Sequence, residues 1–268
     1  MTTINMTAIV ILVFVAFSGA AFAQDSAPSN RLATGSDPDS VPDWFYTCCN
    51  ESPSPPGAGR SNREGRVLKK GFLAPSTSDR QSLTRFLSLP HTGLFRLLPR
   101  EVYDSQYAHP KTPVKIRGGG AYYSFVNLTH QYGYGSDIEL DHNRVSVGFA
   151  GADYGMITLL GDAPLEQISA KDPQVHFIAS YHPPASEPQA RTEARRLRFG
   201  GGVTIDGLNY QSSVPLVENS TYLLRSIAYD NSDVLVAFRV VKKDKDGSVI
   251  IAWKLLKKYR PPVFQRGK

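Results

Sequence analysis

Short runs of β-branched and aromatic residues, separated by Gly, Asn and Asp, make up most of the chain from Val114 onward. Runs of this length and composition are typical of strands. Because little helical pattern lies between them, the predicted fold class is mainly β. We expect antiparallel sheets, in a sandwich or an open barrel, with one or two short helices before and within the β region. The predicted strands are 114–117, 121–128, 138–140, 144–150, 156–160, 175–181, 221–229, 234–242 and 248–257.

The last two predicted strands carry apolar residues at alternate positions, and this pattern predicts how they pair. Their apolar faces coincide only if the connecting loop has an even number of residues. A four-residue loop over 244–247 meets this condition, pairs Lys243 with Ser248 and places Phe238 opposite Trp253. The reverse faces are also mainly apolar but include Arg239 and Lys254. We therefore expect a central hairpin that is covered on both sides, with these two charges near a rim.

Helices are expected in two places. Ser78 followed by Gln81 forms a capping-box pattern, and the helix that it starts should end before Pro90. Apolar residues recur at helical spacing again over 191–198. The apolar segment 94–98 is too short for its periodicity to define its structure.

An export signal is predicted at the N-terminus. Residues 8–17 are all apolar, and small residues then lead into Ala21-Phe22-Ala23 before Gln24. This layout is typical of a secretory signal peptide, here residues 1–23, with cleavage after Ala23. Because these 23 residues contain no Lys or Arg, a retained anchor and a buried helix stay open as alternatives. We expect a secreted or periplasmic protein with no integral membrane span after cleavage.

A flexible tether is predicted over residues 24–75, which are rich in Pro, Ser and Gly, before a β-rich domain over 76–268. The aromatic residues of 44–46 would dock on that domain or on a partner. Cys48 and Cys49 are adjacent, so they cannot join distant segments. A strained disulfide, a bridge to another chain and no role in activity all stay open.

The positive charge of the chain is concentrated at its C-terminus. The net charge is +6, and six Lys and Arg residues follow Asp246 with no acidic residue among them. The rest of the chain is therefore balanced. We expect no nucleic-acid partner, and interpret the basic tail as a solubilising feature or a contact with an anionic envelope surface.

Three carboxylates, Asp137, Glu139 and Asp141, alternate with apolar residues and would share one face of a strand, close in sequence to His130 and His142. Such a cluster suits calcium or acid–base chemistry, and an ordinary solvated strand face is the alternative. No calcium-loop motif is present, and we expect neither a metal site nor a cofactor.

A second group of candidates surrounds the glycines of 118–120, 133 and 135. Exposed aromatic residues beside glycine loops form platforms for sugars or peptides, although tyrosine also packs within sheets. The candidate ligand-binding residues are Tyr122, Tyr123, Tyr132, Tyr134 and His130.

The sequence lacks the motifs of the common hydrolases and metalloenzymes: Gly-x-Ser-x-Gly, Ser-x-x-Lys, His-Glu-x-x-His and Cys-x-x-Cys are all absent. A site assembled by the fold from distant residues is still open. We therefore favour a binding domain over an enzyme.

Four strings resemble a group of exported bacterial proteins to which no activity is assigned: TGLFRLLPRE at 92–101, RGGGAYYSF at 117–125, YGYGSDIEL at 132–140 and VGFAGADYG at 147–155. The likeness extends to the final hairpin and implies a bacterial envelope setting, without catalytic residues. Three functions follow as hypotheses. The first is a domain that binds an envelope component or a protein partner. The others are a hydrolase of an envelope polymer that uses the carboxylates, and a structural subunit of an envelope assembly. The oligomeric state is left open.

Overall fold

The computed structural model describes residues 72–107, 109–133, 135–149 and 152–265. Several sequence predictions fall outside these residues: the signal peptide, the tether up to residue 71, the aromatic residues of 44–46, Cys48 and Cys49, and Tyr134. Within the described part of the chain, no helix is long and apolar enough to cross a membrane.

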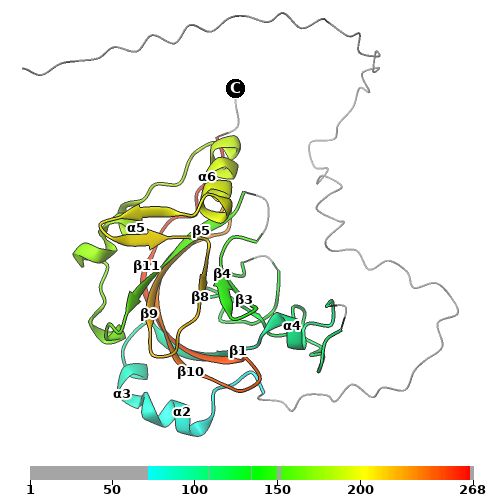
Figure 1. Ribbon diagram of the computed structural model, residues 1–268. Coiled ribbons are helices and arrows are strands. Elements are labelled where there is room, and N and C mark those ends of the chain that lie inside the picture. Colours follow the sequence, from blue (N-terminus) through cyan, green and yellow to red (C-terminus); the bar gives the residue numbers. More distant parts are fainter. Residues whose placement is uncertain (1–71, 108, 134, 150–151, 266–268) are drawn as a thin grey trace, which may run out of the picture. The chain divides into compact units, whose positions relative to one another are not determined.

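The main element of the fold is a five-stranded antiparallel sheet, curved in Figure 1, with the strand order β1-β11-β10-β9-β5. Its long central strands are rich in Val, Leu and Ile, as expected for strands buried on both faces. The strands are β1 (Thr92–Leu97), β5 (Tyr154–Gly161), β9 (Thr221–Ala228), β10 (Ser232–Lys243) and β11 (Val249–Lys258).

A smaller antiparallel sheet, with the order β2-β3-β4-β8, covers one face of the large sheet. Side chains of both sheets form one buried cluster, in which Phe95 stacks on Tyr123 with ring centroids 3.7 Å apart. The two sheets therefore form a sandwich, and the predicted fold class is confirmed. The strands of the small sheet are β2 (Tyr122–Tyr123), β3 (Ile138–Asp141), β4 (Arg144–Ser146) and β8 (Ser213–Pro215).

Helices cover the other face of the large sheet, where Leu223, Leu235 and Ala252 contribute to a second buried cluster. Phe86 reaches this cluster from the N-terminal helices, Ile178 from α5, and Ala190 and Leu197 from α6. The helices are α2 (Thr77–Ser82), α3 (Thr84–Leu87), α5 (His176–Ser180) and α6 (Glu187–Phe199), with the short turns η1 (Leu165–Gln167) and η2 (Pro173–Val175). A further short helix, α4 (Arg100–Tyr103), contacts β3, and β6 (Val203–Ile205) pairs with β7 (Leu208–Tyr210).

The pairing predicted for the final hairpin is confirmed at its centre, where Phe238 lies opposite Trp253. A register shift between Val240 and Lys242 changes the pairing toward the loop, so Lys243 faces Val249 and not Ser248 as predicted. Arg239 and Lys254 lie at the edge of the covered face. Arg239 donates to the carbonyl of Ala163, and Lys254 to the carbonyls of Glu166 and Ile168.

Four local predictions are wrong. The predicted strand 121–128 is limited to Tyr122–Tyr123, and residues 125–128 form a turn. The predicted strand 175–181 is largely the helix α5. Residues 114–117 form a single bridge, from Val114 to Asp104, and no strand. The first helix has its capping box at Ser76 and Asp79, two residues before the predicted one, because the Asp79 carboxylate accepts the Ser76 backbone N–H at 3.0 Å.

Candidate functional site

The three predicted carboxylates do not share one face. Strand β3 begins at Ile138, so the alternation does not extend to Asp137, whose side chain is 1% exposed. Its Oδ2 accepts the backbone N–H of Phe125 at 2.7 Å, and its Oδ1 has no hydrogen-bond partner among the described residues. Burial raises the pKa of Asp137 to about 6, although nearby hydroxyl groups oppose the shift.

Glu139 and Asp141 do share the outer face of the small sheet, where each already has partners. Glu139 accepts from Arg100 Nη1 at 2.7 Å and from the hydroxyl of Tyr122 at 2.6 Å. Asp141 accepts from the hydroxyl of Tyr107 at 2.7 Å. Desolvation comes first among the causes that raise the pKa of Tyr107 to about 12, followed by its bond to Asp141. This cluster is a closed network of charge-assisted hydrogen bonds.

One group in this area has the composition of a metal site. Glu101, Asp141 and His142 each offer a ligand atom, and these atoms lie within 4.8 Å of one another. They also satisfy one another: His142 donates its backbone N–H to Glu101 at 3.2 Å, and its Nδ1 lies 2.9 Å from Asp141 Oδ1. Hydrogen bonding around the β3–β4 turn thus accounts for the group without an ion.

The glycine turn beside the predicted tyrosines has a fixed conformation. Gly118, Gly119 and Gly120 all have positive φ angles, and a Cβ at Gly119 would lie 2.4 Å from the backbone nitrogen of Asp104. Only glycine fits such a position without strain. The turn carries exposed Arg117, whose guanidinium lies 5.3 Å from the centre of the Tyr132 ring.

The predicted ligand-binding residues are divided between the surface and the core. Tyr132 is partly exposed at the surface, and its ring centroid lies 4.5 Å from that of buried Tyr122. Tyr123 belongs to the core, and His130 packs against it while its Nε2 contacts the carbonyl of Arg96 at 2.7 Å. Burial lowers the pKa of His130. For Tyr123 and His130, packing is the role that the structure shows.

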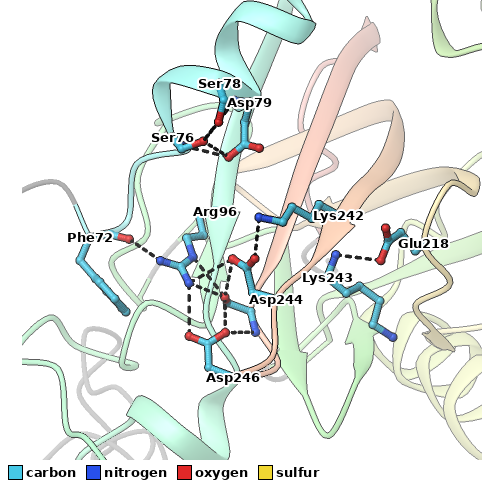
Figure 2. A network of polar contacts seen from close by, with 11 residues as sticks. Phe72, Ser76, Ser78, Asp79, Arg96, Glu218, Lys242, Lys243, Asp244 and Asp246 are labelled. Carbon is cyan, nitrogen blue, oxygen red and sulfur yellow. Dashed lines mark hydrogen bonds and ion pairs between the residues drawn. The ribbon is translucent and has the colours of Figure 1, made fainter.

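A polar network around Arg96 stabilises the β10–β11 loop, and Figure 2 shows Arg96 at its centre. The Arg96 guanidinium lies 3.2 Å from Asp244 Oδ2 and 3.2 Å from Asp246 Oδ2, and it donates to Ser248 Oγ at 2.7 Å. Although burial opposes the shift, hydrogen bonds from Ser248 and Tyr103 lower the pKa of Asp246. Arg96 supplies the positive charge that two converging carboxylates require, so this network has a structural role.

The interior of the helix-covered face contains an ion pair that no sequence motif indicates. Arg225 of β9 and Asp233 of β10 are each 2% exposed or less and form two parallel hydrogen bonds of 2.9 and 2.8 Å. The remaining terminal nitrogen of Arg225, Nη1, donates to the carbonyls of Ile178 and Tyr181 at 2.9 and 2.6 Å. The ring of Tyr259 covers the guanidinium at 3.9 Å. This buried ion pair therefore fixes the position of the C-terminal half of α5 and of Tyr181, the first residue of the segment that follows the helix.

That segment, residues 181–184, forms one wall of a groove of about 630 Å³, and α6 forms the other. Further hydrogen bonds hold the wall in place. The hydroxyls of Tyr181 and Tyr154 lie 2.8 Å apart, and the hydroxyl of Tyr229 donates to the carbonyl of Pro184 at 2.7 Å. Both ends of the segment are thus fixed to the large sheet by buried polar groups.

Polar side chains of α6 face this wall across the groove. Gln189, Thr192, Glu193 and Arg196 line it together with Pro188. Arg196 Nη2 donates to Glu193 Oε2 at 2.6 Å, and Gln189 Oε1 accepts the hydroxyl of Ser186 at 2.9 Å. Small-molecule sites usually have volumes of about 300–1,000 Å³ and a few convergent polar groups. The groove has both properties.

A second hollow, of about 300 Å³, lies between α3 and the 162–166 segment and includes Arg239. The Arg239 side chain in this hollow already donates hydrogen bonds to Ala163, Thr221 and Asp162. The α6 groove is therefore the better candidate for a binding site.

Sequence reasoning missed this groove because its residues match no motif, although its two walls, 181–184 and α6, are separated in the chain only by Ala185 and Ser186. One signal was present: Arg225 is a charged residue within the otherwise apolar run of β9. A buried Arg needs a partner and polar contacts, so that residue indicated an internal polar centre but not the groove beside it.

Comparison with known proteins identifies no relative. No protein-family model, no curated protein sequence and no solved structure matches the chain.

Proposed function

We propose that the protein is an exported binding domain that acts at the bacterial cell envelope, with the groove between α6 and residues 181–184 as its binding site. The buried Arg225–Asp233 ion pair is the observation that carries the proposal. The Arg225 nitrogen that does not bond Asp233 donates to the carbonyls of Ile178 and Tyr181, beside the groove. The predicted export signal and tether support the location.

The buried ion pair makes the wall of the groove rigid. Removing two charges from water is unfavourable, and an ion pair in the interior recovers that free energy only when its geometry is good and its other hydrogen bonds are satisfied. Here the satisfied bonds hold a loop that lacks regular secondary structure. A wall that is fixed before binding reduces the entropy lost when a ligand binds.

The contacts of the carboxylates favour binding over hydrolysis. A hydrolase with two carboxylates needs one as an acid and the other as a base or nucleophile, both at the same substrate bond. Asp137 is buried, whereas Glu139 lies on the outer face, bonded to Arg100 and Tyr122. The hydrolase hypothesis would use Glu139 or Asp141 on that face.

Sedimentation with isolated cell-wall and membrane fractions tests the proposal. We expect the purified protein to sediment with at least one of these fractions and to release no soluble fragments from it. Release of fragments, abolished by Glu139→Gln, would establish the hydrolase instead. Absence from both pellets would contradict binding at the envelope.

Two variants distinguish the candidate surfaces in the same assay. Glu193→Gln changes the groove, and Arg117→Ala changes the outer face beside Tyr132. Arg191→Ala is the matched control, since Arg191 pairs with Glu187 on α6 and does not line the groove. We expect only Glu193→Gln to weaken sedimentation. A loss confined to Arg117→Ala would move the site to the outer face.

A further inference from the structure

We infer that the α6 groove binds an uncharged oligosaccharide of N-acetylated amino sugars. The inference rests on the proposed function, because it names the ligand class of the same site. Four properties of the groove lead to it: charge balance, the spacing of polar groups, apolar ring surfaces and the nature of the walls.

The carboxylate and the guanidinium that line the groove beside His182 balance each other, which disfavours a strongly anionic or cationic ligand. Glu193 and Arg196 neutralise each other through a contact of 2.6 Å. A site for phosphate or for a carboxylate polymer would instead present several uncompensated cations. The groove therefore suits a ligand without net charge.

The polar groups of α6 repeat at the spacing of one helix face. Gln189, Thr192, Glu193 and Arg196 are related by intervals of three and four residues, so they follow one another along the groove. The Gln189 amide can donate to an acetamido carbonyl while the Glu193 carboxylate accepts an acetamido N–H. The guanidinium nitrogens of Arg196 that do not bond Glu193 then contact sugar hydroxyls, because the Thr192 hydroxyl already donates to the carbonyl of Pro188 at 2.9 Å. This alternation of donors and acceptors matches a ligand that carries both.

Flat apolar surfaces complete the site. The ring of Tyr181 and the rings of Pro184 and Pro188 line the groove, and such surfaces pack against the C–H faces of pyranose rings. The walls are a helix and a loop, so the groove offers no strand edge to which an extended peptide could add. These two features favour a sugar over a peptide.

The test is a titration of ¹⁵N-labelled protein with chitotetraose, followed by amide chemical shifts. Cellotetraose, which lacks acetamido groups, and tetra-alanine are titrated in parallel. We expect chitotetraose alone to shift the amides of Tyr181, His182 and α6. Gln189→Ala and Glu193→Gln should each weaken binding about tenfold, equivalent to about 1.4 kcal/mol, whereas Arg191→Ala should leave it unchanged. Gln189 is exposed and Glu193 partly exposed, so both variants should fold, and circular dichroism checks this.

Three results would overturn the inference: no shifts with chitotetraose, shifts that map outside the groove, or equal binding of cellotetraose or tetra-alanine. Its failure is separable from that of the proposed function. Sedimentation with envelope fractions without chitotetraose binding would leave the envelope function in place and remove the sugar assignment. Chitotetraose binding without sedimentation would keep the sugar assignment and remove the envelope function.

Discussion

At the scale of single residues, the interior of this protein contains ionisable groups in otherwise apolar surroundings. Asp137 immediately precedes β3, and Arg225 and Asp233 lie in the neighbouring strands β9 and β10 of the large sheet. Arg225 and Asp233 satisfy each other, whereas Asp137 has one oxygen without a partner among the described residues. These groups should therefore respond differently to substitution and to pH.

Asp137 should make the stability depend on pH. Its pKa is raised from 3.8 to about 6 in the folded protein, so the folded state binds the proton more tightly than the unfolded chain does. The resulting stabilisation is complete below about pH 4 and is lost as the pH rises through about 6. It corresponds to about 3 kcal/mol of unfolding free energy. In urea titrations at pH 4 and pH 7.5, Asp137→Asn should reduce the loss of stability between the two values.

Asp153 is the matched comparison for this experiment, because burial raises its pKa to about 6 as well. Asp153→Asn should remove a separate part of the same pH dependence. If Asp137→Asn left the dependence equal to that of the wild type, the side chain of Asp137 would be solvated.

Asp233→Ala should be among the most destabilising single substitutions, because it leaves the buried Arg225 guanidinium without its carboxylate. We expect a loss of about 3–5 kcal/mol in urea denaturation. The double variant Arg225→Met with Asp233→Leu removes both charges and should be less destabilised. It should still bind chitotetraose more weakly than the wild type, since Tyr181 loses the donor to its carbonyl. A loss below about 1 kcal/mol for Asp233→Ala would show that the pair is not buried.

At the scale of elements, short runs of β-branched and aromatic residues were the most informative pattern in the sequence. This pattern predicted the positions of β5, β9, β10 and β11, and alternation within the last two strands predicted the Phe238–Trp253 pairing. It failed for 175–181, since a short apolar run fits a helix and a strand equally well. It also missed β6, β7 and β8, whose three residues each are too few to show a period.

Trp253 connects three elements, and truncating it tests the predicted hairpin pairing. Its side chain packs against Phe125 at 5.4 Å between ring centroids and lies directly over Gly93 of β1, where a Cβ would be 2.5 Å from the indole nitrogen. Trp253→Ala should therefore reduce the unfolding free energy by about 3–5 kcal/mol. Combined with Gly93→Ala, it should be destabilised by less than the sum of the single variants, because the alanine methyl enters the vacated space. A loss below about 1 kcal/mol for Trp253→Ala would contradict the pairing.

The Arg96 network should stabilise the β10–β11 loop. Arg96→Met leaves the carboxylates of Asp244 and Asp246 without their shared cation, and we expect a loss of about 2 kcal/mol by thermal denaturation. Lys242→Met is the control, because Lys242 pairs with Asp244 at 2.9 Å but is half exposed. Its effect should be small, because this ion pair is exposed to solvent. Equal effects of the two substitutions would show that the loop does not depend on Arg96.

At the scale of the whole molecule, the large sheet is covered by a second sheet on one face and by helices on the other. The predicted strands indicated antiparallel sheets in a sandwich or an open barrel, and the apolar reverse faces of the last two strands predicted that the hairpin is covered on both sides. The sequence did not reveal the groove, because its walls form only when β9 and β10 position α5 and the segment after it. The predicted site residues were also close in sequence, but the fold divided them between the core and the outer face of the small sheet.

The central claim is that the protein uses this groove to bind a component of the cell envelope. Hydrogen–deuterium exchange of the protein with and without an isolated envelope fraction measures this directly. We expect slower exchange in residues 181–196, which include the wall and most of α6, and unchanged exchange in the β3–β4 turn (141–144) on the outer face. Slower exchange at the outer face alone, or no change in either region, would contradict the claim.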